Sequence, residues 1–343
     1  MPQREEMRMK TRKILLTLSL SAMLLLSACG GSPAGGETSP EGGDTSATGS
    51  SQTDGEGASG SSELSPAMQA VVDSVTAENA QATGVCGPDI VWYFKDGVLV
   101  LEGTGPMTDY GYFDDQDHGN SPWYDFSDEI SMIYVPEGVT TVGRRAFTNT
   151  AQLSRVVLPS TLESSGEYAF QESGLTSIVI PDGITEIPNG MFSDCGQLQE
   201  IVIPDSVTKF GDDAFFGCGL TNFIIPDSVT KIGDNAFSEC YNLQEITIPN
   251  SVTEIGEHAF FACALQELTI PASVTSIGTR VINEGRLVFL GDAPAPMRED
   301  HDSFYDNFFY YEYDEVTVVY HGEGFEPYIE AAEGYPNIQW VKG

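Results

Sequence analysis

The chain has 343 residues with 51 acidic and 15 basic side chains, which gives a formal net charge of −36 at pH 7. Such an excess of carboxylates repels nucleic acid and anionic lipid headgroups, so a DNA or RNA partner is excluded. The length is sufficient for a large buried core.

The first segment has the pattern of an export signal. Residues 1–13 carry five basic side chains, and residues 14–26 form an apolar run that is short for a membrane span of about 20 residues. The run ends in Leu-Ser-Ala-Cys-Gly at residues 26–30, which resembles the lipobox of bacterial lipoproteins. The resemblance implies that residues 1–28 are removed and that lipid on Cys29 holds the protein at the outer face of the cell membrane. The alternative is an ordinary signal peptide that contains a cysteine.

Residues 29–64 are predicted to form a disordered linker, since residues 30–62 consist almost entirely of Gly, Ser, Thr, Pro, Ala, Asp and Glu. A short helix is expected within residues 65–84. Ser65-Pro66 is a helix-start signal. A weak apolar pattern follows it, made of Met68, Val71, Val72 and Val75.

Residues 85–129 are predicted to form an N-terminal capping module. Two apolar runs, residues 90–94 and 98–101, flank Lys95-Asp96-Gly97, which is a strong signal for a tight hairpin. Such a hairpin covers the open edge that the first coil of a stack presents.

The loop from Asp109 to Asp128 contains six aspartates, which suggests calcium. Aligned from Asp114, however, the EF-hand pattern would place Gln116 and His118 at ligand positions, so the match is poor. A solvated acidic loop is the favoured interpretation.

A repeat dominates residues 130–285. Prolines recur with alternating steps of 23 and 22 residues, a period typical of solenoids, whose units bury their apolar faces only by stacking on neighbours. These prolines are Pro136, Pro159, Pro181, Pro204, Pro226, Pro249 and Pro271.

Each unit has a fixed order of elements. Apolar residues before the proline predict a short strand that stacks in parallel on its copies, and Val-Thr-x-Ile after the proline predicts a second extended piece. A glycine follows, where a sharp backbone bend is expected. An Ala-Phe pair comes next, and its phenylalanine at one fixed place per coil predicts a ladder of rings in the core: Phe147, Phe170, Phe192, Phe215, Phe237 and Phe260.

The repeat Ile-Pro-x-Ser-Val-Thr-x-Ile-Gly-x-x-Ala-Phe-x-x-Cys resembles the BspA-type leucine-rich repeat of bacterial surface proteins. The resemblance implies a curved leucine-rich-repeat solenoid of the α/β horseshoe kind, mostly β with short helical turns, and a role in surface attachment or adhesion. It brings no catalytic motif, and neither a cofactor nor a metal is expected. The hairpin around Trp92 and residues 103–110 resemble the module that often precedes such repeats. The last coil departs from the pattern with Val281-Ile282 in place of Ala-Phe.

Six cysteines are present, and four of them occupy one column of the repeat. Stacked side chains that point the same way hold their β-carbons farther apart than a disulfide prefers, so free, packed thiols are predicted. Disulfides and zinc are weaker alternatives, since no paired ligand spacing occurs. The four are Cys195, Cys218, Cys240 and Cys263.

Residues 286–343 are predicted to form a C-terminal cap. Many aromatic residues lie among carboxylates between Phe304 and Glu315. Such rings can stack on sugars, but the last coil also needs a lid, and the lid is favoured.

Two columns on the main strands are predicted to face away from the core and to form a continuous binding surface, apolar toward the first coils and acidic toward the last. The alternative is that β-branched residues simply suit an exposed sheet. The expected partner is an extracellular protein or glycan, for example of a host matrix. The columns contain Tyr134, Val157, Val179, Val202, Ile224, Thr247 and Thr269, and Arg155, Glu200, Glu245 and Glu267.

Two other function classes stay open. Glu245 and Glu267 belong to one column on adjacent strands, where two carboxylates can approach the roughly 5 Å separation of a retaining glycosidase. Both belong to a repeated Leu-Gln-Glu triplet, however, and copies made by repetition carry little specific chemistry. The other class is a passive spacer.

Overall fold

The computed structural model describes residues 64–111, 120–296, 315–332 and 337–343. They belong to the second of two compact units, Ser62–Gly343. The lipidation site at Cys29 and the linker lie outside the described residues. The same is true of Asp114, Asp115 and Asp117 of the acidic loop and of the aromatic residues 304–313.

The N-terminal part is a helix and a three-stranded antiparallel meander. The helix is α2 (Pro66–Asp73), and the strands are β1 (Ala82–Gly87), β2 (Ile90–Lys95) and β3 (Val98–Gly103). Asp96 and Gly97 both have positive φ, as the tight β2–β3 turn requires. Strand β3 then pairs in parallel with the first repeat strand, so the meander caps the stack.

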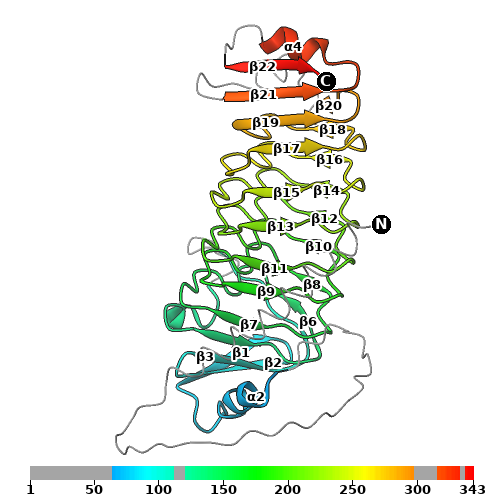
Figure 1. Cartoon of the computed structure of the whole chain (residues 1–343). Helices are drawn as coiled ribbons and strands as arrows, with labels where there is room; N and C mark the ends of the chain where they lie inside the picture. Colours follow the sequence, from blue (N-terminus) through cyan, green and yellow to red (C-terminus); the bar gives the residue numbers. More distant parts are fainter. Residues whose placement is uncertain (1–63, 112–119, 297–314, 333–336) are drawn as a thin grey trace, which may run out of the picture. The chain divides into compact units, whose positions relative to one another are not determined.

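The repeat strands form a first sheet along one side of the solenoid (Figure 1). In each three-residue strand the central side chain faces the core, for example Ile133 beside Val156. The strands are β5 (Met132–Tyr134), β7 (Arg155–Val157), β9 (Ser177–Val179), β11 (Glu200–Val202), β13 (Asn222–Ile224), β15 (Glu245–Thr247) and β17 (Glu267–Ile270).

The alternation of 23 and 22 residues has a structural consequence in this sheet. Coils 23 residues apart pair their strands, as in β9 with β11 and β13 with β15. Across the 22-residue steps, between β7 and β9, β11 and β13, and β15 and β17, the ladder is interrupted. The core columns stay aligned, so the missing loop residue changes the hydrogen bonding of the strands and not the stacking of the core.

A second set of short parallel strands runs along another side of each coil. In the strands of this set between residues 186 and 277 the inward side chain is apolar and fully buried, as are Phe210 and Ile232. They are β4 (Gly105–Pro106), β6 (Val139–Val142), β8 (Ser164–Ser165), β10 (Glu186–Ile187), β12 (Lys209–Phe210), β14 (Lys231–Ile232), β16 (Glu254–Ile255), β18 (Ser276–Ile277) and β20 (Ala295–Pro296). We call the ladder from β10 to β20 the second sheet.

The predicted ladder of rings is confirmed. Phe147, Phe170, Phe192, Phe215, Phe237 and Phe260 stack with ring centroids 5.1–5.8 Å apart. Trp123, just before the 3₁₀ turn η1 (Tyr124–Phe126), extends the ladder at 5.4 Å from Phe147 and donates its Nε1–H to the carbonyl of Ala146.

The repeated glycine does not serve the sharp bend that the sequence suggests. Gly233 and Gly256 do not have positive φ. A Cβ at Gly233 would lie 2.6 Å from the carbonyl carbon of Gly211, and one at Gly256 would lie 2.4 Å from that of Gly233. Glycine is needed here because the backbone of the preceding coil passes too close for any side chain.

The C-terminal end is closed by a parallel extension of the first sheet. Tyr328 on the helix is buried, and its hydroxyl donates to the carbonyl of Pro294 at 2.6 Å. Phe325 is also buried in the core. The elements are β19 (Glu284–Phe289), β21 (Glu315–Tyr320), α4 (Glu326–Ala332) and β22 (Ile338–Lys342). Within the described residues, the helices lack the length and apolar character needed to cross a lipid bilayer.

Candidate binding face on the first sheet

The outward surface of β9, β11, β13, β15 and β17 is the candidate site, and we call it the front face. Its central column is apolar at one end and becomes Thr247 and Thr269 at the other. Val179 is 40 % exposed, while Val202 and Ile224 are half-buried. The column therefore presents an apolar strip to solvent, as predicted for these three residues.

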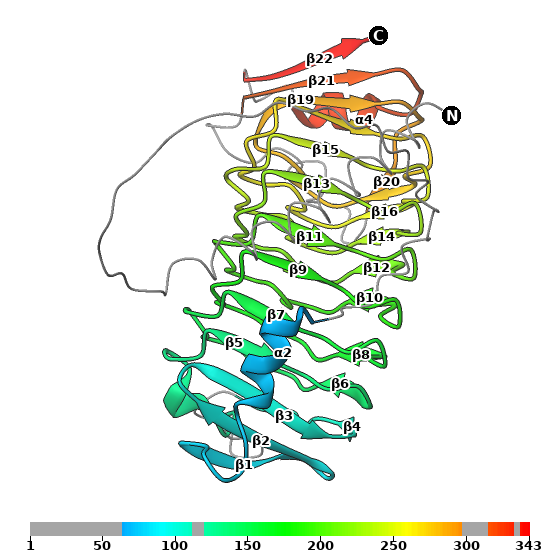
Figure 2. The same ribbon diagram turned by 60° about the horizontal axis from the view of Figure 1, so that its bottom comes forward.

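The first two members of the predicted column lie under a helix. Ser65 caps α2 by accepting from the N–H of Met68 at 3.4 Å. Val72 is buried and forms a cluster with Val100 of β3, with Met132 and Tyr134 of β5 packed against it. Figure 2 shows α2 lying across β3, β5 and β7. Tyr134 thus belongs to an internal contact, which corrects the expectation that the binding surface begins at the first coil.

The covered end also includes Val157, which is 9 % exposed. A pocket beside α2 is lined by Leu64, Gln69, Tyr134, Glu137 and Val157. Burial, followed by the charges of Glu137 and Asp73, raises the pKa of Tyr134. The free part of the column therefore starts at Val179.

The second predicted column contains charges of two kinds. Glu267 is held by Arg286 of β19 at 2.9 Å, whereas Glu200 and Glu245 have no ion-pair partner among the described residues. Arg155 is exposed on the helix-covered coil. The glycosidase alternative needs Glu245 and Glu267 to act together on a substrate, but Glu267 is engaged with Arg286.

A third column escaped the sequence analysis. The residue directly after the repeat proline is acidic and exposed in three of the middle coils. Its place is shown by the first coil, where the equivalent Glu137 lines the pocket with Tyr134. The signal was present in the repeated Ile-Pro-Asp triplet. The members are Asp182, Asp205 and Asp227.

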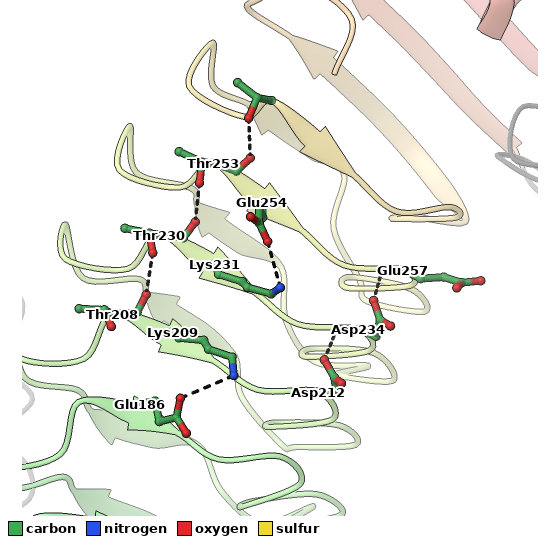
Figure 3. A network of polar contacts seen from close by, with 11 residues as sticks. Glu186, Thr208, Lys209, Asp212, Thr230, Lys231, Asp234, Thr253, Glu254 and Glu257 are labelled. Carbon is green, nitrogen blue, oxygen red and sulfur yellow. Dashed lines mark hydrogen bonds and ion pairs between the residues drawn. The ribbon is translucent and has the colours of Figure 1, made fainter. Parts of the chain in front are cut away.

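The outward side chains of the second sheet contact one another (Figure 3). Lys209 pairs with Glu186 at 3.6 Å and Lys231 with Glu254 at 2.9 Å. Thr230 donates its hydroxyl to the carbonyl of Thr208 in the preceding coil, and Thr253 does the same to Thr230, both at 3.2 Å.

A column of acids at the adjoining corner is bound in the same way. A carboxylate oxygen of Asp212 accepts from the N–H of Asp234 at 2.9 Å, and one of Asp234 accepts from the N–H of Glu257 at 2.8 Å. These carboxylates therefore bind the next coil (Figure 3).

The column cysteines are free and buried, as predicted. Each thiol donates to the phenylalanine carbonyl of the preceding coil, for example Cys240 to Phe215 at 3.2 Å. Thr150 fills the same column and donates to Phe147 at 2.8 Å, so the position takes a small donor. Burial raises the pKa of Cys195 to about 11 and that of Cys263 to about 12, so these thiols are poor nucleophiles.

The repeat region matches a known family model. The model of the BspA type leucine rich repeat region matches residues 120–243 and 208–287 in six copies. The chain is similar to a leucine-rich repeat protein from Bacteroides ovatus, with 19% identity, coverage of 74% of this chain and 76% of that one, and a TM-score of 0.49. It is also similar to a leucine rich cell surface protein from Faecalibacterium prausnitzii, with 20% identity, coverage of 78% and 97%, and a TM-score of 0.37.

A leucine rich repeat protein from T. pallidum is 24% identical over 55% of this chain and 88% of that one, with a TM-score of 0.41. No curated protein matches the sequence.

Proposed function

Since the chain belongs to the family of BspA-type leucine-rich-repeat proteins, we propose that it is a non-enzymatic bacterial surface lipoprotein that binds another protein through its front face. The lipobox-like sequence at Cys29 supports the anchor, and the linker of residues 29–64 supports a binding domain held away from the membrane. The family's occurrence in bacterial surface proteins supports the location.

One observation carries the binding function. The same outward column of the first sheet is covered by α2 at Tyr134 and Val157 but is bare at Val179, Val202 and Ile224. Where α2 lies on the first sheet, apolar side chains of the sheet are buried against the helix. The bare continuation is available to a segment of another protein.

The binding proposal is tested with the chain lacking residues 1–28. Replacing Val179, Val202 and Ile224 together by Ser removes apolar area without touching the inward core residues or the net charge. Capture of a partner from host extracellular matrix should fall by at least about tenfold, because desolvated apolar centres carry most interface energy. The matched control replaces Lys209, Lys231 and Glu254 of the second sheet by Ala. A folded Ser variant that captures the partner as well as the parent does would refute the proposal.

The anchor is tested in living cells. With Cys29→Ala, metabolic labelling by a fatty acid should disappear and processing of the signal should change. Labelling that persists would show that Cys29 is not the lipidated residue.

A further inference from the structure

The apolar strip of the front face lies between two rows of carboxylates. In the first row, Glu200 begins the strand of Val202 and Glu245 begins the strand of Thr247. The same place on the strands of Val179 and Ile224 is held by the uncharged Ser177 and Asn222. The second row lies beyond the strand ends on the other side of the strip, and its members are Asp182, Asp205 and Asp227.

The first coil shows that the second row lies beside the apolar strip. Glu137 holds the equivalent place there, lines the pocket together with Tyr134 and Val157, and contributes to the raised pKa of Tyr134. The coils stack in register, so Asp205 has the same relation to Val202 that Glu137 has to Tyr134.

Within the described residues, Glu200, Glu245, Asp182 and Asp205 form no ion pair with a basic side chain. Residues 176–275 contain 14 carboxylates and two cations, a net charge of −12, and Glu267 is paired with a cation outside this range, Arg286. Both cations, Lys209 and Lys231, lie on the second sheet and pair with Glu186 and Glu254. The front face therefore has a negative potential at the edges of an apolar centre.

Helix α2 covers the first coils of the face and not the coils from β9 onward. Its eight residues contain one acid, Asp73, and no base, and it lies on the coils where Arg155 is exposed and the carboxylate rows are incomplete. The bare coils carry Asp182, Asp205 and Asp227 in the second row and Glu200 and Glu245 in the first. A segment with the charge of α2 is repelled there, while a segment of opposite charge is attracted.

We propose that the front face from β9 to β15 binds a basic amphipathic segment of another protein, with apolar side chains on Val179, Val202 and Ile224 and Lys or Arg side chains against the two carboxylate rows. The inference rests on the proposed function and specifies its partner. Contacts of cations with exposed carboxylates mainly raise the association rate and select the partner, whereas the apolar centre supplies most of the affinity.

The test uses the chain lacking residues 1–28 and three synthetic peptides of about 16 residues with identical leucines and valines, in which the remaining positions are Lys, Ser or Glu. The Lys peptide should bind, the Ser peptide should bind at least about tenfold more weakly, and the Glu peptide should not bind. Raising NaCl from about 50 mM to about 300 mM should weaken the Lys peptide several-fold.

Two variants locate the contact. Glu200→Gln with Glu245→Gln and Asp205→Asn should weaken the Lys peptide by at least about fivefold. The control, Asp96→Asn with Glu163→Gln and Glu172→Gln, removes the same number of negative charges elsewhere on the surface and should change the affinity by less than about twofold. Replacing Val179, Val202 and Ile224 by Ser (the Ser triple) should also lower the affinity for the Lys peptide. Non-specific attraction of the peptide to an acidic protein would not depend on these three residues.

The remaining outcomes decide between the two proposals. If both charge variants weaken the Lys peptide equally, or the Ser triple leaves it unchanged, the binding is non-specific and the basic partner is refuted. If matrix capture depends on the Ser triple but not on Glu200, Glu245 and Asp205, the proposed function stands and the partner is not basic. A dimer in sedimentation that the Ser triple abolishes would make a second copy the occupant and overturn the inference.

Discussion

The two sheets of the solenoid share one core but use their outward side chains differently. On the second sheet, Lys231 is paired with Glu254, and Thr230 donates to the coil before it. On the first sheet, Val179 is exposed, and Glu200 has no ion-pair partner among the described residues. Outward side chains that hold the coils together are satisfied within the protein. In the part of the chain that the structure describes, the outward side chains of the first sheet make no such contacts at Val179 and Glu200, and they form the front face that we propose as the binding surface.

The largest expected effect comes from the core that both sheets share. Phe237 lies between Phe215 and Phe260, with ring centroids 5.1 Å and 5.4 Å away, so Phe237→Ala should lower the free energy of unfolding by about 3–5 kcal/mol. Amide exchange should increase in β13 and β14 alike. Lys231→Ala on the second sheet should stay within about 0.5 kcal/mol. Equal effects of the two changes in chemical denaturation would show that the core assignment is wrong.

A smaller loss is expected at the corner after β14. In Gly233→Ala the new Cβ would lie 2.7 Å from the backbone nitrogen of Asp212, and such overpacking costs about 1–3 kcal/mol. The control is Gly196→Ala, where the nearest atom to the new Cβ is 4.0 Å away. Gly196→Ala should be neutral in thermal unfolding. A neutral Gly233→Ala would mean that the coils can move apart here.

The helix-covered end of the first sheet should respond locally. Val72→Ala removes buried apolar area between α2 and Val100, which contributes about 1–2 kcal/mol to the docking of the helix. Proteolysis within residues 66–73 should accelerate while the unfolding temperature of the coils stays nearly constant. Val71→Ala, at a half-buried position, is the control. If the coils unfold together with α2, the helix is part of the cooperative core and does not cover a separable face.

The smallest effect depends on pH and concerns the corner beside the second sheet. Burial raises the pKa of Asp213 above its ordinary value of 3.8; a hydrogen bond with Asn235 opposes this shift, and the charges of Asp212, Asp234 and Asp194 add to it. Ionisation of Asp213 therefore disfavours the folded state, and this loss grows as the pH rises from 3.8 through the raised value.

Asp213→Asn should consequently gain up to about 0.5 kcal/mol at pH 7, since Asn tolerates the φ of 55°. The gain should vanish below the ordinary pKa, where Asp213 is protonated in both states. A gain that does not change with pH would point to another cause.

The sequence predicted what repetition determines. The strands, the Phe237 ladder, the free thiols and the outward position of Val179 all follow from the period and from the preferred surroundings of each residue type. The packing of α2 on the first coils could not be predicted from the sequence. The apolar pattern of Met68 to Val75 predicts a helix but does not say on which distant strand the helix packs. The sharp bend expected at Gly233 was the wrong explanation for the glycine, because a side chain there would clash with the backbone of the preceding coil, which the repeat pattern does not reveal. The Glu267–Arg286 pair was missed because Arg286 lies in the irregular last coil.

The interrupted strand ladder has a consequence for the gene. One 23-residue step and one 22-residue step form a unit of 45 residues. The two first-sheet strands within such a unit pair with each other, whereas the strands of neighbouring units do not pair. Unequal recombination that duplicates or deletes 45 codons leaves every junction between coils as it was. Each duplication lengthens the front face by about 10 Å, the spacing of two strands. The lineage can therefore alter the reach of this surface by changing copy number, without a new core having to evolve.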